Sequence, residues 1–172
     1  LMNKGFEVLE ASHLFGIPSE RVEVVVHRES IIHSAVEYID NTVIAEMSVP
    51  DMRACVQYAV DYPDREEGTV APLDLFSVGR LTFARPDTAT FPLLSLAAEA
   101  GRLGGGMGAV LNAADEVAVE AFLREKLTFT GIFSVVTRAF DKMRRVGVGC
   151  ERSVDALIAL DRETRAYTET LI

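Results

Sequence analysis

The chain has 172 residues, of which 49% are hydrophobic, which is enough for a core in one or two small domains. Its formal net charge is −9, and residues 1–89 carry 7 Lys+Arg against 15 Asp+Glu. This balance argues against nucleic acid, which requires a basic surface. No run reaches the roughly 18 apolar residues of a membrane span, and the opening residues do not have the pattern of an export signal. We therefore expect a cytoplasmic protein that binds neither nucleic acid nor a membrane.

The opening residues predict a short amphipathic helix. Apolar residues recur at helical spacing and a glycine ends the pattern, at Phe6, Leu9, Leu14 and Gly16. Asn3 is predicted near the N-cap, and Asn3, Lys4 and Glu7 are spaced to share one face. An amide, an ammonium and free helix N–H groups suit a phosphate, whereas a carboxylate beside them suits a hard cation. The same residues also fit an ordinary helix start with solvated charges.

Alternating patterns then predict three strands and a second helix. The strands are predicted over Arg21–His27, Ile31–Ile39 and Val43–Val49, with Asp40-Asn41 as a two-residue turn that makes a hairpin of the last two. Pro50-Asp51 ends the third strand and starts the helix. The predicted buried face of this helix comprises Met52, Cys55, Val56, Ala59 and Val60. Cys55 and Cys150, the only cysteines of the sequence, are expected to be reduced thiols.

The rest of the chain predicts a linker and a helical bundle. Residues 63–92 contain four prolines and no lasting period, so we expect a linker with a short strand at Arg80–Phe83. Residues 93–172 carry four helical stripes, and we expect a small bundle that folds independently of the hairpin. Its helices are expected to break at Gly101 and Gly104–Gly106, with a third helix capped by Thr130 and ended by Gly147, and a fourth capped by Ser153. The fold class is thus α+β, with domains at 1–62 and 93–172.

Four further groups could carry chemistry. His27 follows a predicted strand and could act as an acid, a base or a substrate ligand, whereas His33 with Ser34 fits a half-buried hairpin pair. The glycine run before Met107 lacks the strand and the Lys-Ser/Thr of a phosphate loop, so a helix–helix turn is favoured. The last group could ligate a metal, but packing and capping are favoured for Asn112, Asp115 and Glu116.

Three long motifs resemble one enzyme family: MNKGFEVLEA over 2–11, HRESIIHSAVEYIDNTVIAEMSVPDMR over 27–53, and VLNAADEVAVEAFL over 110–123. They are similar to the C-terminal part of 1-deoxy-D-xylulose 5-phosphate reductoisomerase, an NADPH- and divalent-metal-dependent enzyme of the non-mevalonate isoprenoid pathway. The resemblance implies a partial catalytic domain, a linker and a C-terminal helical domain. The family begins with an NADPH-binding domain, whereas no strand with a glycine fingerprint opens this chain. We therefore expect an inactive fragment that binds no cofactor tightly.

The resemblance also implies roles for individual residues. Asn3 and Lys4 match substrate-binding positions, and Glu7 matches a ligand of Mg²⁺ or Mn²⁺ that also approaches the phosphorylated sugar substrate. The family's other metal carboxylates precede Leu1. His27 is a weaker catalytic candidate, because this chain has HRES where family sequences often have HPQS. Met52, with Pro50, matches a segment near the nicotinamide. The family also implies a homodimer.

A second class of function is open. The chain could be a non-catalytic α+β and helical module that mediates dimerisation or binds a protein partner. The predicted hairpin could support such a role through edge pairing. Residues upstream of Leu1 would favour the enzyme, and the absence of an initiator methionine at position 1 points the same way.

Overall fold

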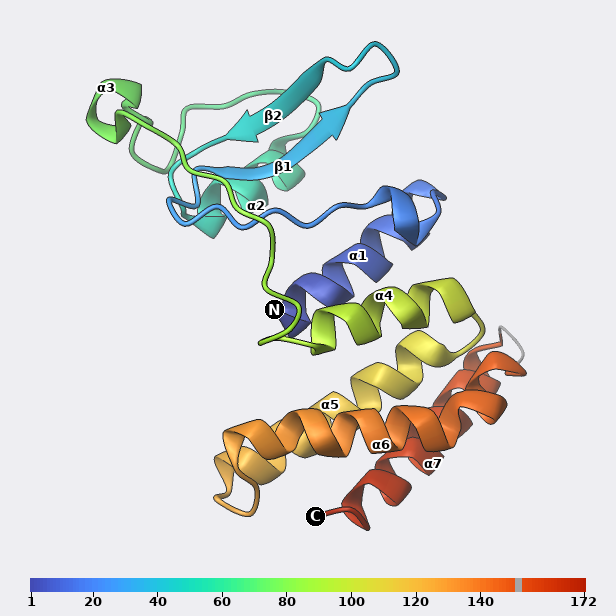
Figure 1. Cartoon of the computed structure of the whole chain (residues 1–172). Helices are drawn as coiled ribbons and strands as arrows, with labels where there is room; N and C mark the ends of the chain where they lie inside the picture. Colours follow the sequence, from blue (N-terminus) through green and yellow to red (C-terminus); the bar gives the residue numbers. More distant parts are fainter. Residues whose placement is uncertain (151–152) are drawn as a thin grey trace. The chain divides into compact units, whose positions relative to one another are not determined.

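A computed structural model describes residues 1–150 and 153–172, which form two compact units. Residues 1–24 and 87–172 make a helical unit, and residues 25–86 make a smaller α+β unit. The helical unit contains α1 (Met2–Phe15), the 3-10 turn η1 (Ser19–Arg21), α4 (Leu93–Leu103), α5 (Met107–Leu123), α6 (Phe129–Val148) and α7 (Val154–Glu169) (Figure 1). The smaller unit contains β1 (Ile32–Glu37), β2 (Val43–Met47), α2 (Met52–Asp61) and α3 (Leu75–Val78). The predicted α+β class is confirmed.

Helix α1 begins at Met2, so Asn3 lies near the N-cap as predicted. Leu1 is the N-cap residue and makes no side-chain capping bond, so Asn3 lies within the first turn. The Asn3 side-chain amide instead donates to Glu7, one turn further along. Gly16 ends the helix as predicted, with a left-handed φ of 62° and its N–H bonded to the Ser12 carbonyl.

Helix α5 is the centre of the helical unit, with α4, α6 and α7 packed around it. Small side chains on α5 let its neighbours approach closely, and larger ones fill the space between the helices. The side chains with no exposed surface on α5 are Met107, Val110, Leu111, Ala113, Ala114 and Ala118. On α6, Val136, Ala139 and Phe140 are equally buried. The first three helical stripes predicted from Leu93 onward therefore form one core. The fourth prediction is wrong, because Val154 and Ile158 are exposed and α7 contributes Leu160 instead.

The glycine run between α4 and α5 makes a tight turn against the end of α6. The Gly106 N–H donates to the Gly147 carbonyl at 2.8 Å, and a Cβ on Gly105 would lie 2.5 Å from that same oxygen. Gly105 also has a φ of 58°, which disfavours other residues. The predicted helix–helix turn is confirmed, and the run serves backbone packing.

Two predicted caps of the third helix in the bundle are wrong by two residues each. Thr128, not Thr130, caps α6, since its hydroxyl accepts the Gly131 N–H at 3.1 Å. Gly147 lies inside α6, where it packs against the side chain of Met107, and the helix continues to Val148. Ser153 does cap α7, as predicted, by accepting the Ala156 N–H at 3.2 Å.

The hairpin forms, but its turn is longer than predicted. Strands β1 and β2 pair antiparallel, and the Tyr38 N–H closes the loop on the Thr42 carbonyl at 2.8 Å. Asn41 has a left-handed φ of 64° in a three-residue loop, so the two-residue turn was wrong. A bulge in β1 between Ile32 and Ser34 also interrupts the alternation expected along this strand.

Two of the predicted strands do not form. The segment from Arg21 to His27 begins with the end of η1 and makes one isolated bridge, in which Val26 and Ala84 exchange two backbone hydrogen bonds of 2.9 Å. The strand predicted at Arg80–Phe83 is replaced by the chain leading into this same bridge. The alternating valines therefore lie in extended backbone but form no strand, because only one residue pair is hydrogen-bonded.

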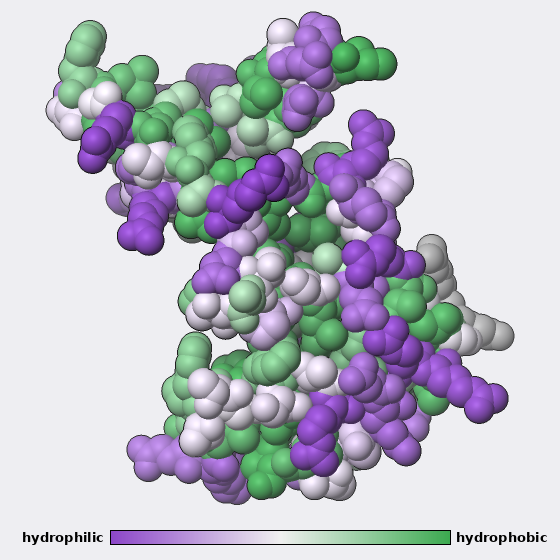
Figure 2. All heavy atoms as spheres, viewed as in Figure 1, coloured by the Kyte–Doolittle hydropathy of each residue, from purple (hydrophilic) through white to green (hydrophobic). Residues whose placement is uncertain are grey.

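Helix α2 is capped as expected, but its apolar face is exposed. Asp51 accepts the Arg53 N–H, and hydrogen bonds and charge from Arg53 lower the Asp51 pKa to about 2. The predicted burial is wrong: Met52 is 75% exposed, and Cys55, Val56 and Val60 are also exposed. No helix or strand among the described residues packs extensively on this face. Figure 2 shows hydrophobic residues on the surface of this unit.

The units divide the chain differently from the predicted domain ranges. Helix α1 packs on α4, so residues 1–24 group with the bundle and not with the hairpin. Residues 63–86 belong to the α+β unit, where the Gln57 side chain bonds the backbones of Glu67 and Thr69. The assignment of residues 1–62 to a catalytic domain stays a prediction. Within the described residues, no helix has the length and apolar character needed to cross a membrane.

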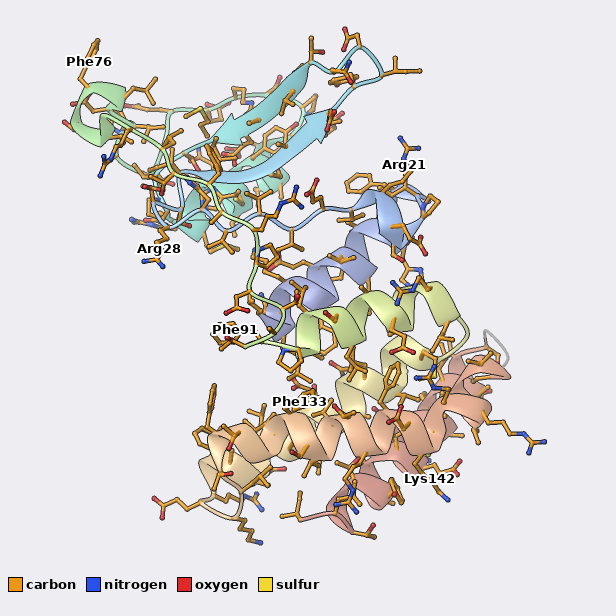
Figure 3. All side chains as sticks on the ribbon, in the orientation of Figure 1. Arg21, Arg28, Phe76, Phe91, Phe133 and Lys142 are labelled. Atoms are coloured by element: carbon orange, nitrogen blue, oxygen red, sulfur yellow. The ribbon has the colours of Figure 1, made fainter. Side chains whose placement is uncertain are left out.

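The buried α5–α6 contact predicts a large stability effect. Phe140 has no exposed surface, so Phe140→Ala should destabilise the helical unit by about 3–5 kcal/mol in urea titration. Phe76 on α3 is 97% exposed and points away from the ribbon (Figure 3), so Phe76→Ala is the matched control and should change stability little. Equal effects of the two substitutions would contradict the position of the core.

Candidate functional site

Three polar side chains meet on the exposed face of α1. The Asn3 amide donates to Glu7 Oε1 at 2.8 Å, and the Lys4 ammonium lies 2.6 Å from Glu7 Oε2. The predicted sharing of one face is confirmed, with Glu7 as the common partner. About half of the Lys4 and Glu7 side-chain surface remains accessible, so a ligand can reach all three groups.

This cluster presents donors and one carboxylate to solvent. Lys4 and Asn3 can donate to an anionic oxygen, and an exposed ion pair stabilises the fold by only about 0–1 kcal/mol. Breaking the Lys4–Glu7 ion pair to admit a ligand therefore costs little free energy. A bound cation would require the Glu7 oxygens, which would release Lys4 toward an anion. The arrangement suits a ligand that carries both a phosphate and a metal ion.

The described residues do not by themselves fit a magnesium ion. None of their groups combines three or more His, Cys, Asp or Glu side chains in a position to hold a metal. Magnesium requires near-octahedral oxygen coordination, and Glu7 supplies one carboxylate. Glu7 can therefore serve only as one ligand in a set that other groups complete.

A groove of about 380 Å³ runs beside the cluster, between α1 and the first turns of α5. Its lining residues are Asn3, Phe6, Leu9, Glu10, His13, Gly108, Ala109 and Asn112. Glu10 and His13 were missed at the level of sequence, although their spacing from Asn3 and Phe6 places them on the same side of α1. The groove extends the polar surface that begins at Asn3.

The three polar residues weighed on α5 have separate environments. Asn112 faces the groove, whereas Glu116 forms an ion pair with Arg165 of α7. Asp115 is half-buried without a hydrogen bond or ion pair in the described structure, and burial followed by the Glu116 charge raises its pKa. The structure therefore supports the packing interpretation for Glu116 and assembles no metal site from this trio.

His27 is held by neighbours at both ring nitrogens. Its Nε2 accepts the Ile31 N–H at 3.2 Å, so Nδ1 carries the proton and faces the Thr82 carbonyl at 2.9 Å. The ring also stacks on Phe83 and its side chain is only 6% exposed. This geometry supports a structural role that joins two distant segments. A catalytic role for His27 stays a prediction.

The two charges that distinguish HRES from HPQS have different environments. Glu29 accepts hydrogen bonds from the Thr82 hydroxyl at 2.7 Å and the Thr82 N–H at 3.2 Å. The hydroxyl bond is the main reason that its pKa is lowered, and Glu29 also lies 3.0 Å from His27 Nδ1. Glu29 thus reinforces the His27–Thr82 contact. Arg28 is exposed at the surface of its unit (Figure 3).

The remaining candidates of the α+β unit are exposed. His33 is not half-buried as predicted, but pairs across the hairpin with Glu46 at 3.5 Å. Met52 is the first residue of α2 and is available for contact with a ligand or another chain segment. Its contact with a nicotinamide stays a prediction.

Comparison with known proteins identifies the family of this architecture. Residues 47–167 match the family model for the DXP reductoisomerase C-terminal domain. The chain therefore belongs to the 1-deoxy-D-xylulose 5-phosphate reductoisomerase family. It is 51% identical over 167 residues to the reductoisomerase of Caldanaerobacter subterraneus subsp. tengcongensis and 47% identical to that of Clostridium botulinum. These alignments cover 96% and 97% of this chain but only 43% of each relative.

Solved structures of the family share the fold. The Zymomonas mobilis reductoisomerase in complex with NADPH is 38% identical, with a TM-score of 0.89 over 99% of this chain and 44% of that chain. A reductoisomerase in complex with NADPH, fosmidomycin and magnesium is also 38% identical, with a TM-score of 0.94 over 99% of this chain and 43% of that one. The chain thus spans less than half the length of the proteins it matches.

The burial of His27 predicts a structural effect that His33 should not show. His27→Ala removes two hydrogen bonds and a ring contact, so it should destabilise the α+β unit by about 1–3 kcal/mol. His33→Ala removes one exposed pair and should change stability little. Amide hydrogen exchange of residues 25–86 measures both. Unchanged protection in His27→Ala would show that the ring does not hold these segments together.

Proposed function

We propose that this chain is the C-terminal part of a reductoisomerase that converts 1-deoxy-D-xylulose 5-phosphate to 2-C-methyl-D-erythritol 4-phosphate with NADPH and Mg²⁺ or Mn²⁺. Family membership supports the reaction class. The observation that carries the proposal is the Asn3–Lys4–Glu7 cluster, whose donors and carboxylate meet on an accessible helix face. These groups match the chemistry of a phosphorylated sugar held together with a cation.

Each residue of the cluster has a defined part in this proposal. Lys4 neutralises and positions an anionic group of the substrate, and Asn3 donates a hydrogen bond that fixes its orientation. Glu7 is both a metal ligand and a partner that orients Asn3 and Lys4 before substrate arrives. The other metal ligands are contributed by residues that precede Leu1 in the intact enzyme.

The remaining functions belong to the intact enzyme. NADPH binding requires a dinucleotide fold, and the described residues contain only a two-stranded antiparallel sheet. A nicotinamide contact by Met52 would depend on that missing fold. We also propose that the intact enzyme is a cytoplasmic homodimer, with a small phosphorylated sugar as its ligand. On its own, the 172-residue chain is then inactive.

A specific observation favours one alternative, a non-catalytic interaction module. The hairpin exposes apolar side chains, with Val36, Val43 and Ile44 each more than half exposed, and the two-stranded sheet has unpaired edges. A partner could cover this surface by adding a strand. This alternative gives no role to Glu7, so the next experiment distinguishes the two.

Substitution of Glu7 tests the proposed function. In the intact enzyme, Glu7→Gln removes a charged metal ligand, so we expect turnover to fall by about 100-fold or more and the metal concentration for half-activation to rise. Thermal stability should hardly change, because the Glu7 side chain is 44% exposed. Glu20→Gln, at an exposed glutamate of the same unit that does not line the groove, is the matched control. Normal turnover of Glu7→Gln at limiting metal would refute the metal-ligand assignment.

The fold also predicts how the 172-residue chain responds to cofactor. Because its residues 1–150 and 153–172 form no dinucleotide fold, titration calorimetry with NADPH should show no stoichiometric binding. Lysozyme at the same concentration sets the background heat. Micromolar, one-to-one binding would contradict the assignment of NADPH to another part of the enzyme.

A further inference from the structure

Helix α1 contacts the bundle through a residue that has no side chain. Gly5 is buried, and a Cβ built on it would lie 2.5 Å from the Cβ of Ala97 on α4. Ala97 itself has no exposed surface. Ordinary carbon–carbon contacts are about 3.5–4.0 Å, so a methyl group at position 5 cannot fit without moving one helix. The two backbones are therefore as close as this pair of residues allows.

The position of Gly5 relates this contact to the polar cluster. Asn3 and Glu7 lie two residues before and after Gly5, about 200° around the helix from it. Asn3 and Glu7 thus lie opposite the face that touches α4, and Lys4 lies about 100° from Gly5, beside Glu7. Any displacement of α1 away from α4 moves Asn3, Lys4 and Glu7 by a similar amount, because all three side chains project from the same rigid turn.

The helix that receives α1 is itself held firmly. Leu96 and Ala100 of α4 are buried in the common core. Glu99 of α4 also forms a 2.7 Å ion pair with Arg144 of α6. Helix α4 therefore has a fixed position on α5 and α6. Because α1 packs on α4 through Gly5, the position of α4 also determines the position of the cluster.

We propose that Gly5 and Ala97 are positioning residues for the reductoisomerase site, and that the helical unit serves as the platform that sets the placement of Asn3, Lys4 and Glu7. This inference rests on the proposed function. Gly5 touches neither substrate nor metal and acts only through the distance between α1 and α4. The C-terminal bundle thereby contributes to catalysis without supplying a group to the reaction.

The test adds a methyl group at position 5 of the intact enzyme, and then removes the methyl group at position 97 as well. Gly5→Ala should force α1 outward by about 1 Å, lowering kcat/KM by about 10–100-fold and raising the metal concentration for half-activation. In Gly5→Ala/Ala97→Gly the new Cβ would have the Leu93 carbonyl at 3.9 Å and the Cα of residue 97 at 4.0 Å as its neighbours, so it fits. The double variant should recover kcat/KM to within about threefold of the original enzyme and restore the metal dependence.

A matched control separates positioning from simple loss of stability. Gly147→Ala also adds a methyl group to a buried helix contact, against the flexible Met107 side chain in the α5–α6 interface, away from α1. It should leave KM and metal dependence unchanged per folded enzyme. Comparing these constants among folded molecules matters because a stability defect lowers the active fraction without changing either constant.

Each outcome decides the proposal. Gly5→Ala with normal kcat/KM per folded enzyme and normal metal dependence, in an enzyme where Glu7→Gln is impaired, would overturn the positioning role and leave the proposed function intact. An unimpaired Glu7→Gln would instead overturn the proposed function. If Gly5→Ala alone does not fold, the double variant decides: a folded double variant with impaired KM or metal dependence overturns the proposal, and a recovered one supports it.

Discussion

The close approach of α1 to α4 is the contact on which the candidate site depends. A buried glycine faces a buried alanine, so the backbones meet without an intervening side chain. The polar cluster then projects from the opposite side of α1, where Glu7 collects Asn3 and Lys4. Steric fit on one side of a helix thus determines where charge is presented on the other. The large α5-centred core gives this contact a rigid base.

The α+β unit is organised by a different kind of interaction. Ile31 is its buried apolar residue among those described, and most of its large hydrophobic side chains are exposed. The unit is instead joined by hydrogen bonds between distant segments, in which His27 and Glu29 bind Thr82, and Gln57 binds the chain near Thr69. Such polar contacts stabilise less than a buried core. The exposed apolar surface agrees with the proposal that this unit is part of a longer enzyme. The relatives that the chain matches are more than twice its length.

Local patterns in the sequence predicted most helices because their signals are local. The first three stripes after Leu93, the Ser153 cap and the Gly16 stop each depend on residues within a few positions, and each is confirmed, whereas Val154 and Ile158 of the fourth stripe are exposed. The shared face of Asn3, Lys4 and Glu7 follows from helical spacing in the same way. Spacing alone did not assign a function to that face, and the assignment came from the resemblance to the reductoisomerase family.

The errors arose where distant residues decide the structure. An alternating valine run predicted a strand over Arg21–His27, but its pairing depends on Ala84, nearly sixty residues later, and only one pair is in register. The apolar stripe of α2 predicted burial, yet burial requires a covering element that no periodicity can reveal. The contact of Gly5 with Ala97 likewise could not be predicted, since nothing in the sequence around a helical glycine indicates which residue it will contact.

The most direct test of the proposed site is to locate the metal in the intact enzyme. Crystals grown with Mn²⁺ and a phosphorylated substrate analogue give an anomalous signal that identifies the ion without assumption. We predict that a Glu7 carboxylate oxygen coordinates Mn²⁺, while Asn3 and Lys4 bind the analogue from the same face of α1. A fully coordinated Mn²⁺ with no Glu7 oxygen among its ligands would contradict this assignment.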